Sequence, residues 1–131
     1  RYELAETITE NALLASSQKF FEYLSENFSI KKVYRKYPIR HFYQKRLFET
    51  EIDFILETDQ GLVIIQNSDF AGKAKQYKNE ALKMTAWLHL CKTALQVIFK
   101  KGKVRTVVHF VLGGTLVAME TKVKANAGQL S

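Results

Sequence analysis

The 131-residue chain has one cysteine, one proline and no apolar run approaching the ~20 residues that a membrane-spanning helix needs. With Cys91 alone, no internal disulfide can form, and nothing ties the protein to an oxidising compartment. The sequence also lacks the Cys/His spacing of zinc sites, the Gly-x-x-x-x-Gly-Lys-Ser/Thr loop of nucleoside triphosphatases and the Ser-centred elbow of hydrolases. No signal peptide is visible, so we expect a cytoplasmic protein with no membrane partner.

The charge balance is basic, because 20 lysine and arginine residues against 13 aspartate and glutamate residues give a net charge of +7. This surplus predicts a polyanionic partner, although it can also serve only to keep a domain soluble. The length and the 47% hydrophobic share are typical of one globular domain, which we expect over residues 1–121, followed by a flexible tail over residues 122–131. Because the chain opens at Arg1 rather than Met, we expect a fragment of a longer protein.

Residues 51–70 predict two strands joined by a tight turn. Apolar and polar side chains alternate over residues 52–57, Gly61 can take the positive φ of a short hairpin, and residues 62–65 form the continuous apolar run typical of a central strand. The run stops at the polar cluster of residues 66–69. A carboxylate such as Asp53 on one strand, followed by polar groups at the end of the next, is the layout of a Mg²⁺-dependent nuclease.

This arrangement resembles the PD-(D/E)XK nuclease domain at the C-terminus of UvrD/Rep-type helicase-nucleases, the RecB/AddA-like group. The aromatic-proline strand at residues 35–40, the loop at residues 68–72 and the hairpin at residues 108–117 are also similar, so the resemblance covers about residues 20–119. It implies an α+β fold, a restriction-endonuclease-like αβββαβ sandwich whose central mixed sheet is flanked by helices. It further implies an ATP-dependent DNA helicase or exonuclease of recombinational repair as the parent chain. The implied partners are DNA, as a single strand or a duplex end, and the helicase domains.

The resemblance places the degenerate catalytic positions at Asp53, Gln66 and Ser68. Only Asp53 keeps the expected residue type, since the family typically has a second acidic residue and a lysine at the other two places. Together these departures predict a nuclease fold that contacts DNA without cutting it and needs no cofactor in this domain. Further departures fall where the family commonly has Glu, Gln and Tyr: Lys36, Trp87 and Cys91.

Two alternatives remain open from the sequence. In the first, the domain is an active nuclease whose catalytic residues have migrated, with Mg²⁺ held by Asp53, Asp69 and the Asn67 carbonyl, and with Lys73 or Lys78 replacing the missing lysine. Even spacing along an extended strand would place Asp53 on one side with two other carboxylates, those of Glu51 and Glu57. In the second alternative, the domain only packs against its helicase or a partner subunit.

The first predicted strand, residues 32–43, lies in the most basic part of the chain, which has no acidic residue between Lys31 and Glu49. Pro38 cannot donate to a strand ladder, so we expect an edge strand or a bulge at this residue. Interleaved basic and aromatic side chains are typical of grooves that bind single strands, although lysine can also simply protect an edge strand against pairing. The predicted DNA contacts, two of them on the helix that follows the hairpin, are Lys32, Arg35, Lys36, Arg40, Lys73 and Lys78.

The remaining pattern predicts helices and a C-terminal hairpin. A helix is expected over residues 2–28, possibly broken near residues 15–17, with a core-facing stripe formed by Phe20, Phe21, Leu24 and Phe28. A second helix is expected over residues 73–95, with Trp87 and Cys91 buried and His89 at the surface. Strands over residues 104–112 and 115–121 are joined at Gly113–Gly114.

Overall fold

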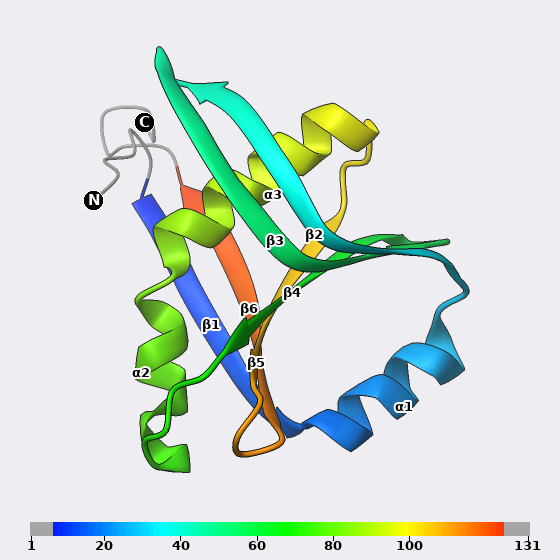
Figure 1. The fold of residues 1–131 in the computed structure, drawn as a ribbon, viewed down its shortest axis with the longest axis vertical. Helices are drawn as coiled ribbons and strands as arrows, with labels where there is room; N and C mark the ends of the chain where they lie inside the picture. The colour runs from blue at the N-terminus through cyan, green and yellow to red at the C-terminus, as the bar shows by residue number, and fades with distance from the viewer. Residues whose placement is uncertain (1–6, 125–131) are drawn as a thin grey trace.

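A computed structural model describes the backbone of residues 7–124 and the side chains of residues 15–119. The elements are β1 (Thr7–Ser16), α1 (Ser17–Asn27), β2 (Ile30–Tyr43), β3 (Arg46–Thr58), β4 (Gly61–Ser68), a 3-10 turn η1 (Ala74–Gln76), α2 (Tyr77–Leu82), α3 (Thr85–Phe99), β5 (Val104–Phe110) and β6 (Thr115–Lys124). The strands form one sheet in the order β1-β6-β5-β4-β3-β2, in which β4 and β5 are parallel and the other neighbours antiparallel (Figure 1). The described part of the chain is thus α+β with a mixed sheet, as the sequence predicts.

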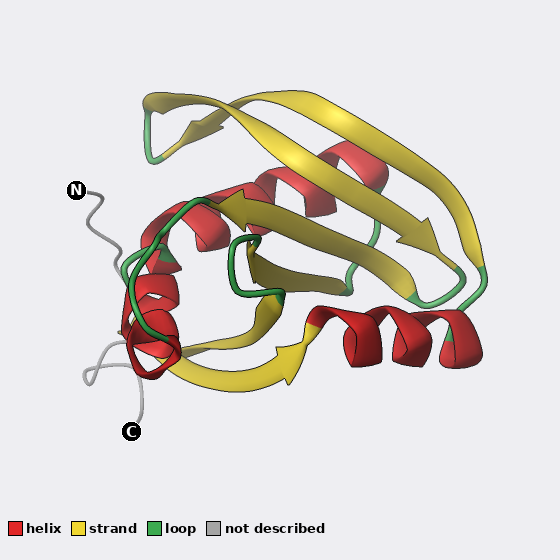
Figure 2. Ribbon diagram, turned by 60° about the horizontal axis from the view of Figure 1, so that its bottom comes forward, coloured by secondary structure: helices red, strands yellow, loops and turns green. Residues whose placement is uncertain are grey.

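Helices cover both faces of the sheet (Figure 2). On one face, α2 and α3 pack on the larger core, which includes Ile64, Leu88 and Phe110. On the other face, α1 packs on a smaller core that includes Leu24 and Val63. Full burial of such a side chain stabilises the fold by about 1.5–3 kcal/mol, so these two cores hold the helices to the sheet. The β2–β3 hairpin curves over α3, and it adds four buried side chains to the larger core: Ile39, Phe48, Ile52 and Ile55.

The N-terminal segment differs from the sequence prediction of a helix over residues 2–28. Residues 7–16 form strand β1, which pairs antiparallel with β6 along its whole length. Pairing with the free edge of β6 overrides the local helical spacing of the apolar side chains. The helix prediction is confirmed from Ser17 to Asn27, and the expected break coincides with the end of β1. There the Ser16 hydroxyl caps α1 by accepting a hydrogen bond from the Lys19 N–H at 3.3 Å.

The predicted helix over residues 73–95 is divided in the structure into η1, α2 and α3, and α3 continues to Phe99. At the break between α2 and α3, the Met84 N–H donates to the Ala81 carbonyl at 2.9 Å, and the Thr85 hydroxyl donates to the Leu82 carbonyl at 2.6 Å. The break allows α2 to contact β1 and β6 while α3 packs against β5 and β2. One straight helix of this length would not follow the curved sheet across both pairs of strands.

The predicted hairpins are confirmed with shifted boundaries, and β6 extends to Lys124, beyond the predicted end at residue 121 and into the expected tail. Gly61 has φ of +112°, and a Cβ there would collide with the Lys103 carbonyl oxygen. Pro38 lies in β2, which is an edge strand as expected. Strand β5 ends at Phe110, so the turn to β6 spans residues 111–114 and is longer than the predicted Gly113–Gly114 connection. Of these two glycines, Gly114 has the positive φ, +57°.

Candidate nucleic-acid interface

The β2–β3 hairpin changes face at Lys36 and Asp53. Arg35 lies opposite Phe54 and Tyr37 opposite Ile52, so Lys36 and Asp53 face one another between these pairs. Lys36 has φ of +49°, in the left-handed region that a lysine rarely adopts. Successive residues of a regular strand point to opposite faces, so Ile52 and Ile55 would lie on different faces. Both are nevertheless buried in the larger core, whereas Phe54 and Leu56 pack in the smaller core.

This switch corrects the expectation that Glu51, Asp53 and Glu57 share one side of the strand. Glu57 follows Ile55 on the face of the larger core, where its carboxylate accepts a hydrogen bond from the Tyr34 hydroxyl at 3.1 Å. Glu51 is adjacent to the buried Ile52, so its side chain points to the opposite face and is exposed. The three carboxylates therefore do not converge.

The side chains of Asp53 on β3 and Gln66 on β4 each form a hydrogen bond to the backbone of the other strand. The ladder between β3 and β4 runs from Thr58 opposite Gly61 to Phe54 opposite Ile65. Beyond that pair, side chains replace the backbone ladder. The Gln66 side-chain carbonyl accepts a hydrogen bond from the Asp53 N–H at 3.1 Å, and the Asp53 carboxylate accepts one from the Asn67 N–H at 3.0 Å. We call this pair of hydrogen bonds, made by Asp53, Gln66 and Asn67, the Asp53 clasp.

Ser68 and Asp69 are the other predicted positions in this stretch. The Ser68 hydroxyl accepts a hydrogen bond from the Phe70 N–H at 3.2 Å, which shapes the turn that leaves β4. The Asp69 side chain is exposed. Among the described residues, no group of three or more His, Cys, Asp or Glu side chains is placed to hold a metal ion. The alternative with bound Mg²⁺ depends on the Asp53 carboxylate, which here accepts a hydrogen bond from the Asn67 N–H.

The six predicted DNA contacts lie in two separate places. Lys32, Arg35, Lys36 and Arg40 are exposed on β2, at one edge of the sheet. Lys73 and Lys78 are also exposed, but they belong to the segment around η1 and α2, and α2 contacts β1 and β6 at the other edge (Figure 1). The six predicted contacts therefore form two groups at opposite edges of the sheet.

Carboxylates on β3 oppose much of the positive charge of β2. Lys32 lies opposite Glu57, and Arg40 lies opposite Glu49. Arg35 differs, because its cross-strand neighbour is Phe54, and its guanidinium carbon lies 5.6 Å from the centre of the Phe54 ring. Such a contact leaves the guanidinium N–H groups available to an anion while the aromatic ring holds the side chain in place.

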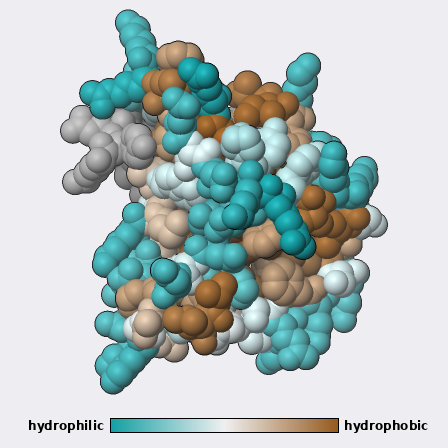
Figure 3. Space-filling view, viewed as in Figure 1, coloured by the Kyte–Doolittle hydropathy of each residue, from teal (hydrophilic) through white to brown (hydrophobic). Residues whose placement is uncertain are grey.

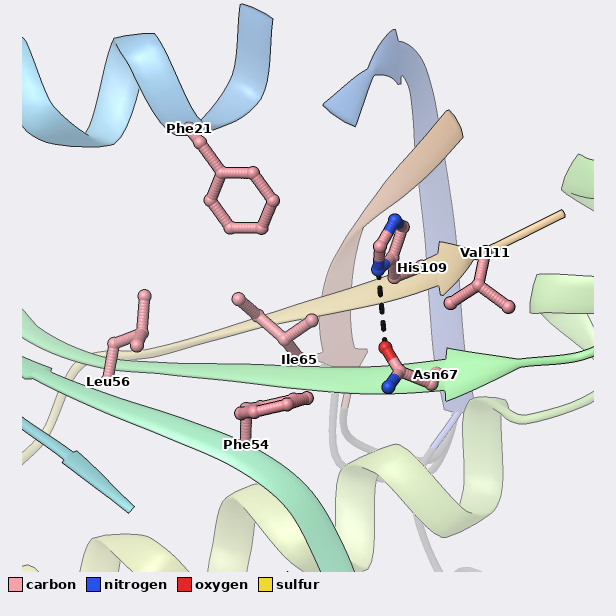
Figure 4. Close-up of a pocket in the computed structure, with 7 residues that line it drawn as sticks. All are labelled: Phe21, Phe54, Leu56, Ile65, Asn67, His109 and Val111. Atoms are coloured by element: carbon pink, nitrogen blue, oxygen red, sulfur yellow. Dashed lines mark hydrogen bonds between the residues drawn. The ribbon is translucent and has the colours of Figure 1, made fainter. Parts of the chain in front are cut away.

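Phe54 opens onto a groove between α1 and the strands β3, β4 and β5. The groove has a volume of about 320 Å³, and we call it the α1 groove. Phe21, from α1, is 40% exposed and lies above it, while Val111, 42% exposed, lies at its end (Figure 4). The lining side chains are Phe21, Phe54, Leu56, Ile65, Asn67, His109 and Val111.

The sequence prediction assigned Phe21 to the core, and this is wrong, whereas Leu24 and Phe28 are buried as expected. Consecutive helical residues point about 100° apart, so the Phe20–Phe21 pair in an 11-residue helix was a signal that one ring would lie outside the core. Phe20 packs against the smaller core. The Phe21 ring instead makes an edge-to-face contact with His109, with centroids 6.3 Å apart.

His109 connects the α1 groove to the Asp53 clasp. Its Nδ1 lies 3.2 Å from the Asn67 side-chain oxygen, on the neighbouring parallel strand, and the Asn67 N–H in turn donates to Asp53 (Figure 4). Partial burial lowers the pKa of His109, so the neutral ring is favoured. In the neutral ring, Nδ1 donates to the Asn67 oxygen and Nε2 is left as an acceptor.

The α3 residues at other departures from the family pattern lie in or near the larger core. Trp87 is half-buried and donates from its indole N–H to the Thr50 hydroxyl at 3.0 Å. Cys91 is fully buried as expected, and burial raises the pKa of its thiol to about 12. His89 is buried, and its predicted place at the surface is wrong.

Hydrophobic patches on the face viewed in Figure 3 are separated by hydrophilic side chains. Within residues 7–124, no helix is both long enough and apolar enough to cross a membrane. No family model matches the chain, and a search of the curated proteins finds no match either.

Proposed function

We propose that this chain is a nucleic-acid-binding domain with a nuclease-like core that does not cut its ligand. From α1 to β5 the elements follow the order helix, three strands, helices, strand, and the last strand is parallel to its neighbour β4. This order supports the restriction-endonuclease-like αβββαβ core that the resemblance implies. In this proposal the parent chain is a DNA helicase of recombinational repair, and the domain guides the strand that the helicase produces.

The Asp53 clasp is the observation that supports the proposed lack of nuclease activity. A catalytic carboxylate must offer its oxygens to a metal ion, but an Asp53 oxygen accepts the Asn67 N–H at 3.0 Å. Gln66, at the place of the second acidic residue, carries no charge and bonds the Asp53 N–H. The hydrogen bond from the Asn67 N–H to the charged Asp53 carboxylate contributes about 1.5–3 kcal/mol. This structural role is sufficient to explain an aspartate at position 53.

The binding half of the proposal is supported by charge. The net charge is +7, and seven basic residues of β2, the following turn and the first position of β3 are exposed. The salt bridge among the described side chains joins Lys83 to Glu80, so it involves none of these seven basic residues. These residues are Lys31, Lys32, Arg35, Lys36, Arg40, Lys45 and Arg46.

A salt titration tests the binding half. Binding of a fluorescein-labelled oligonucleotide is followed by anisotropy in EDTA at increasing NaCl. If about four of these residues contact phosphates of a single strand, log K falls against log salt with a slope of about −3. Substitution of Arg35 by Gln should make the slope shallower by about 0.7. Lys83→Gln is the matched control, because Lys83 is already paired with Glu80 at 2.7 Å. No binding, or a slope near zero, contradicts the proposal.

A further inference from the structure

The α1 groove is suited to one flat, apolar group. Its volume of about 320 Å³ is at the lower end of the roughly 300–1,000 Å³ of small-molecule sites, so it is too small for a helix or strand of a partner. None of the lining side chains is acidic, and most of them are hydrocarbon or aromatic. Asn67 and His109 are the polar lining residues, and they are bonded to one another.

Two phenylalanine rings come into the groove from different elements. In Figure 4, Phe21 extends from α1 towards the sheet, and Phe54 lies on β3 beneath the open space. The Phe21 ring is not covered by the core, since the residue is 40% exposed. An exposed aromatic ring on a helix and a second ring on a strand can both contact the face of one planar ligand.

Two guanidinium groups lie on the face of the sheet that carries the groove. The Arg35 guanidinium lies over Phe54, and Arg35 has no carboxylate as its cross-strand neighbour. On the same face, the Arg105 guanidinium carbon lies 4.7 Å from the centre of the Phe28 ring. The carboxylate of the clasp, that of Asp53, accepts a hydrogen bond from the Asn67 N–H. A ligand with an apolar planar part and an attached anion matches this arrangement.

We propose that the α1 groove receives an unpaired base of a single-stranded nucleic acid, with the face of the base against Phe21 and Phe54 and an adjoining phosphate at Arg35. This inference rests on the proposed nucleic-acid binding and adds the class of ligand. Bases in a duplex are stacked on one another and cannot enter the groove, so single strands are preferred. Every base has a π-face, and the groove walls are mainly apolar, so recognition tolerates different sequences.

The test compares an intact oligothymidylate, the same strand with abasic sites, and a hairpin duplex, all by anisotropy in EDTA. Base–aromatic stacking is worth about 1–3 kcal/mol per base, so removing the bases should weaken binding of the native protein by about tenfold. Phe21→Leu keeps an apolar side chain without a ring, and it should weaken binding of the intact strand by about fivefold or more. It should have no effect on the abasic strand, and the salt slope should not change.

Tyr23→Leu is the matched control, because Tyr23 is a more exposed aromatic residue, 51%, on the same helix as Phe21 and outside the groove. It should leave all three affinities unchanged. Phe54→Leu should repeat the effect of Phe21→Leu, and thermal unfolding of each variant verifies that it is folded. Equal affinity for intact and abasic strands would overturn the base site while leaving the proposed function in place. No binding to any of the three ligands would overturn the proposed function itself.

Discussion

The Asp53 clasp leads to a prediction about stability. Asp53→Ala removes the acceptor of the Asn67 N–H, at the point where the backbone ladder between β3 and β4 has ended. A hydrogen bond to a charged group contributes about 1.5–3 kcal/mol, and the half-buried position of Asp53 reduces this value because water can replace part of the bond. We therefore expect the free energy of unfolding to fall by about 1–2 kcal/mol.

Urea unfolding followed by the fluorescence of Trp87, the one tryptophan, measures this change. With a slope m of about 1–3 kcal/mol per M, the midpoint should fall by about 0.5–1 M urea with m unchanged. Asp53→Asn keeps a neutral acceptor and should cost less than Asp53→Ala. The matched control is Asp69→Ala, because Asp69 is an exposed carboxylate directly after β4. Its free energy of unfolding should stay within about 0.5 kcal/mol of that of the native protein.

The opposite result would refute the structural role. Catalytic residues are often held in places that are unfavourable for stability, so replacing them tends to be neutral or stabilising. If Asp53→Ala unfolds at the same or a higher urea concentration than the native protein, Asp53 is not a clasp residue.

Three further predictions concern other parts of the fold. Burial lowers the pKa of His109, so the unfolded chain binds the proton more readily than the folded chain. The free energy of unfolding should therefore decrease as pH falls below the ordinary histidine pKa of about 6.5. In urea titrations from neutral to mildly acidic pH, His109→Gln should flatten this dependence. Gly61→Ala should destabilise the protein by about 2 kcal/mol or more, since it combines φ of +112° with a collision at the Lys103 carbonyl, whereas Gly102→Ala, which meets no atom within 4 Å, should be neutral or slightly stabilising in the same assay. Burial raises the pKa of Cys91 to about 12, so a thiol reagent at pH 8 should label it only after unfolding, and rapid labelling of the native protein would show that the larger core is open at α3.

Local patterns were enough to predict five of the six strands. Alternation over residues 52–57, the apolar run at residues 62–65 and the glycines at Gly61 and Gly114 are properties of short segments, and the structure confirms the hairpins that they predict. Strand β1 was missed because its apolar spacing fits a helix, and because its pairing with β6 joins segments about 100 residues apart. Such a pairing leaves no local signal in the sequence.

The candidate site depends on geometry that the sequence pattern did not contain. Even spacing on β3 predicted a shared side for three carboxylates, but the left-handed conformation of Lys36 accompanies a change of face at Asp53. A lysine gives no warning of a positive φ, unlike a glycine. The α1 groove was within reach of sequence reasoning at one point, because two adjacent phenylalanines on one helix point about 100° apart and one of them can lie at the margin of the core. The contact between His109 and Asn67 requires the parallel register of β4 and β5, which only the structure supplies.

The measurement that tests the central claim most directly is a cleavage time course on end-labelled single-stranded and duplex DNA, with Mg²⁺, Mn²⁺ and EDTA in parallel. The same preparation is first shown to bind the labelled strand, so that an absence of cutting refers to a complex that has formed. Our account predicts an intact strand in every lane. Metal-dependent cutting that Asp53→Ala abolishes would contradict it, and would establish Asp53 as a catalytic residue rather than a clasp between two strands.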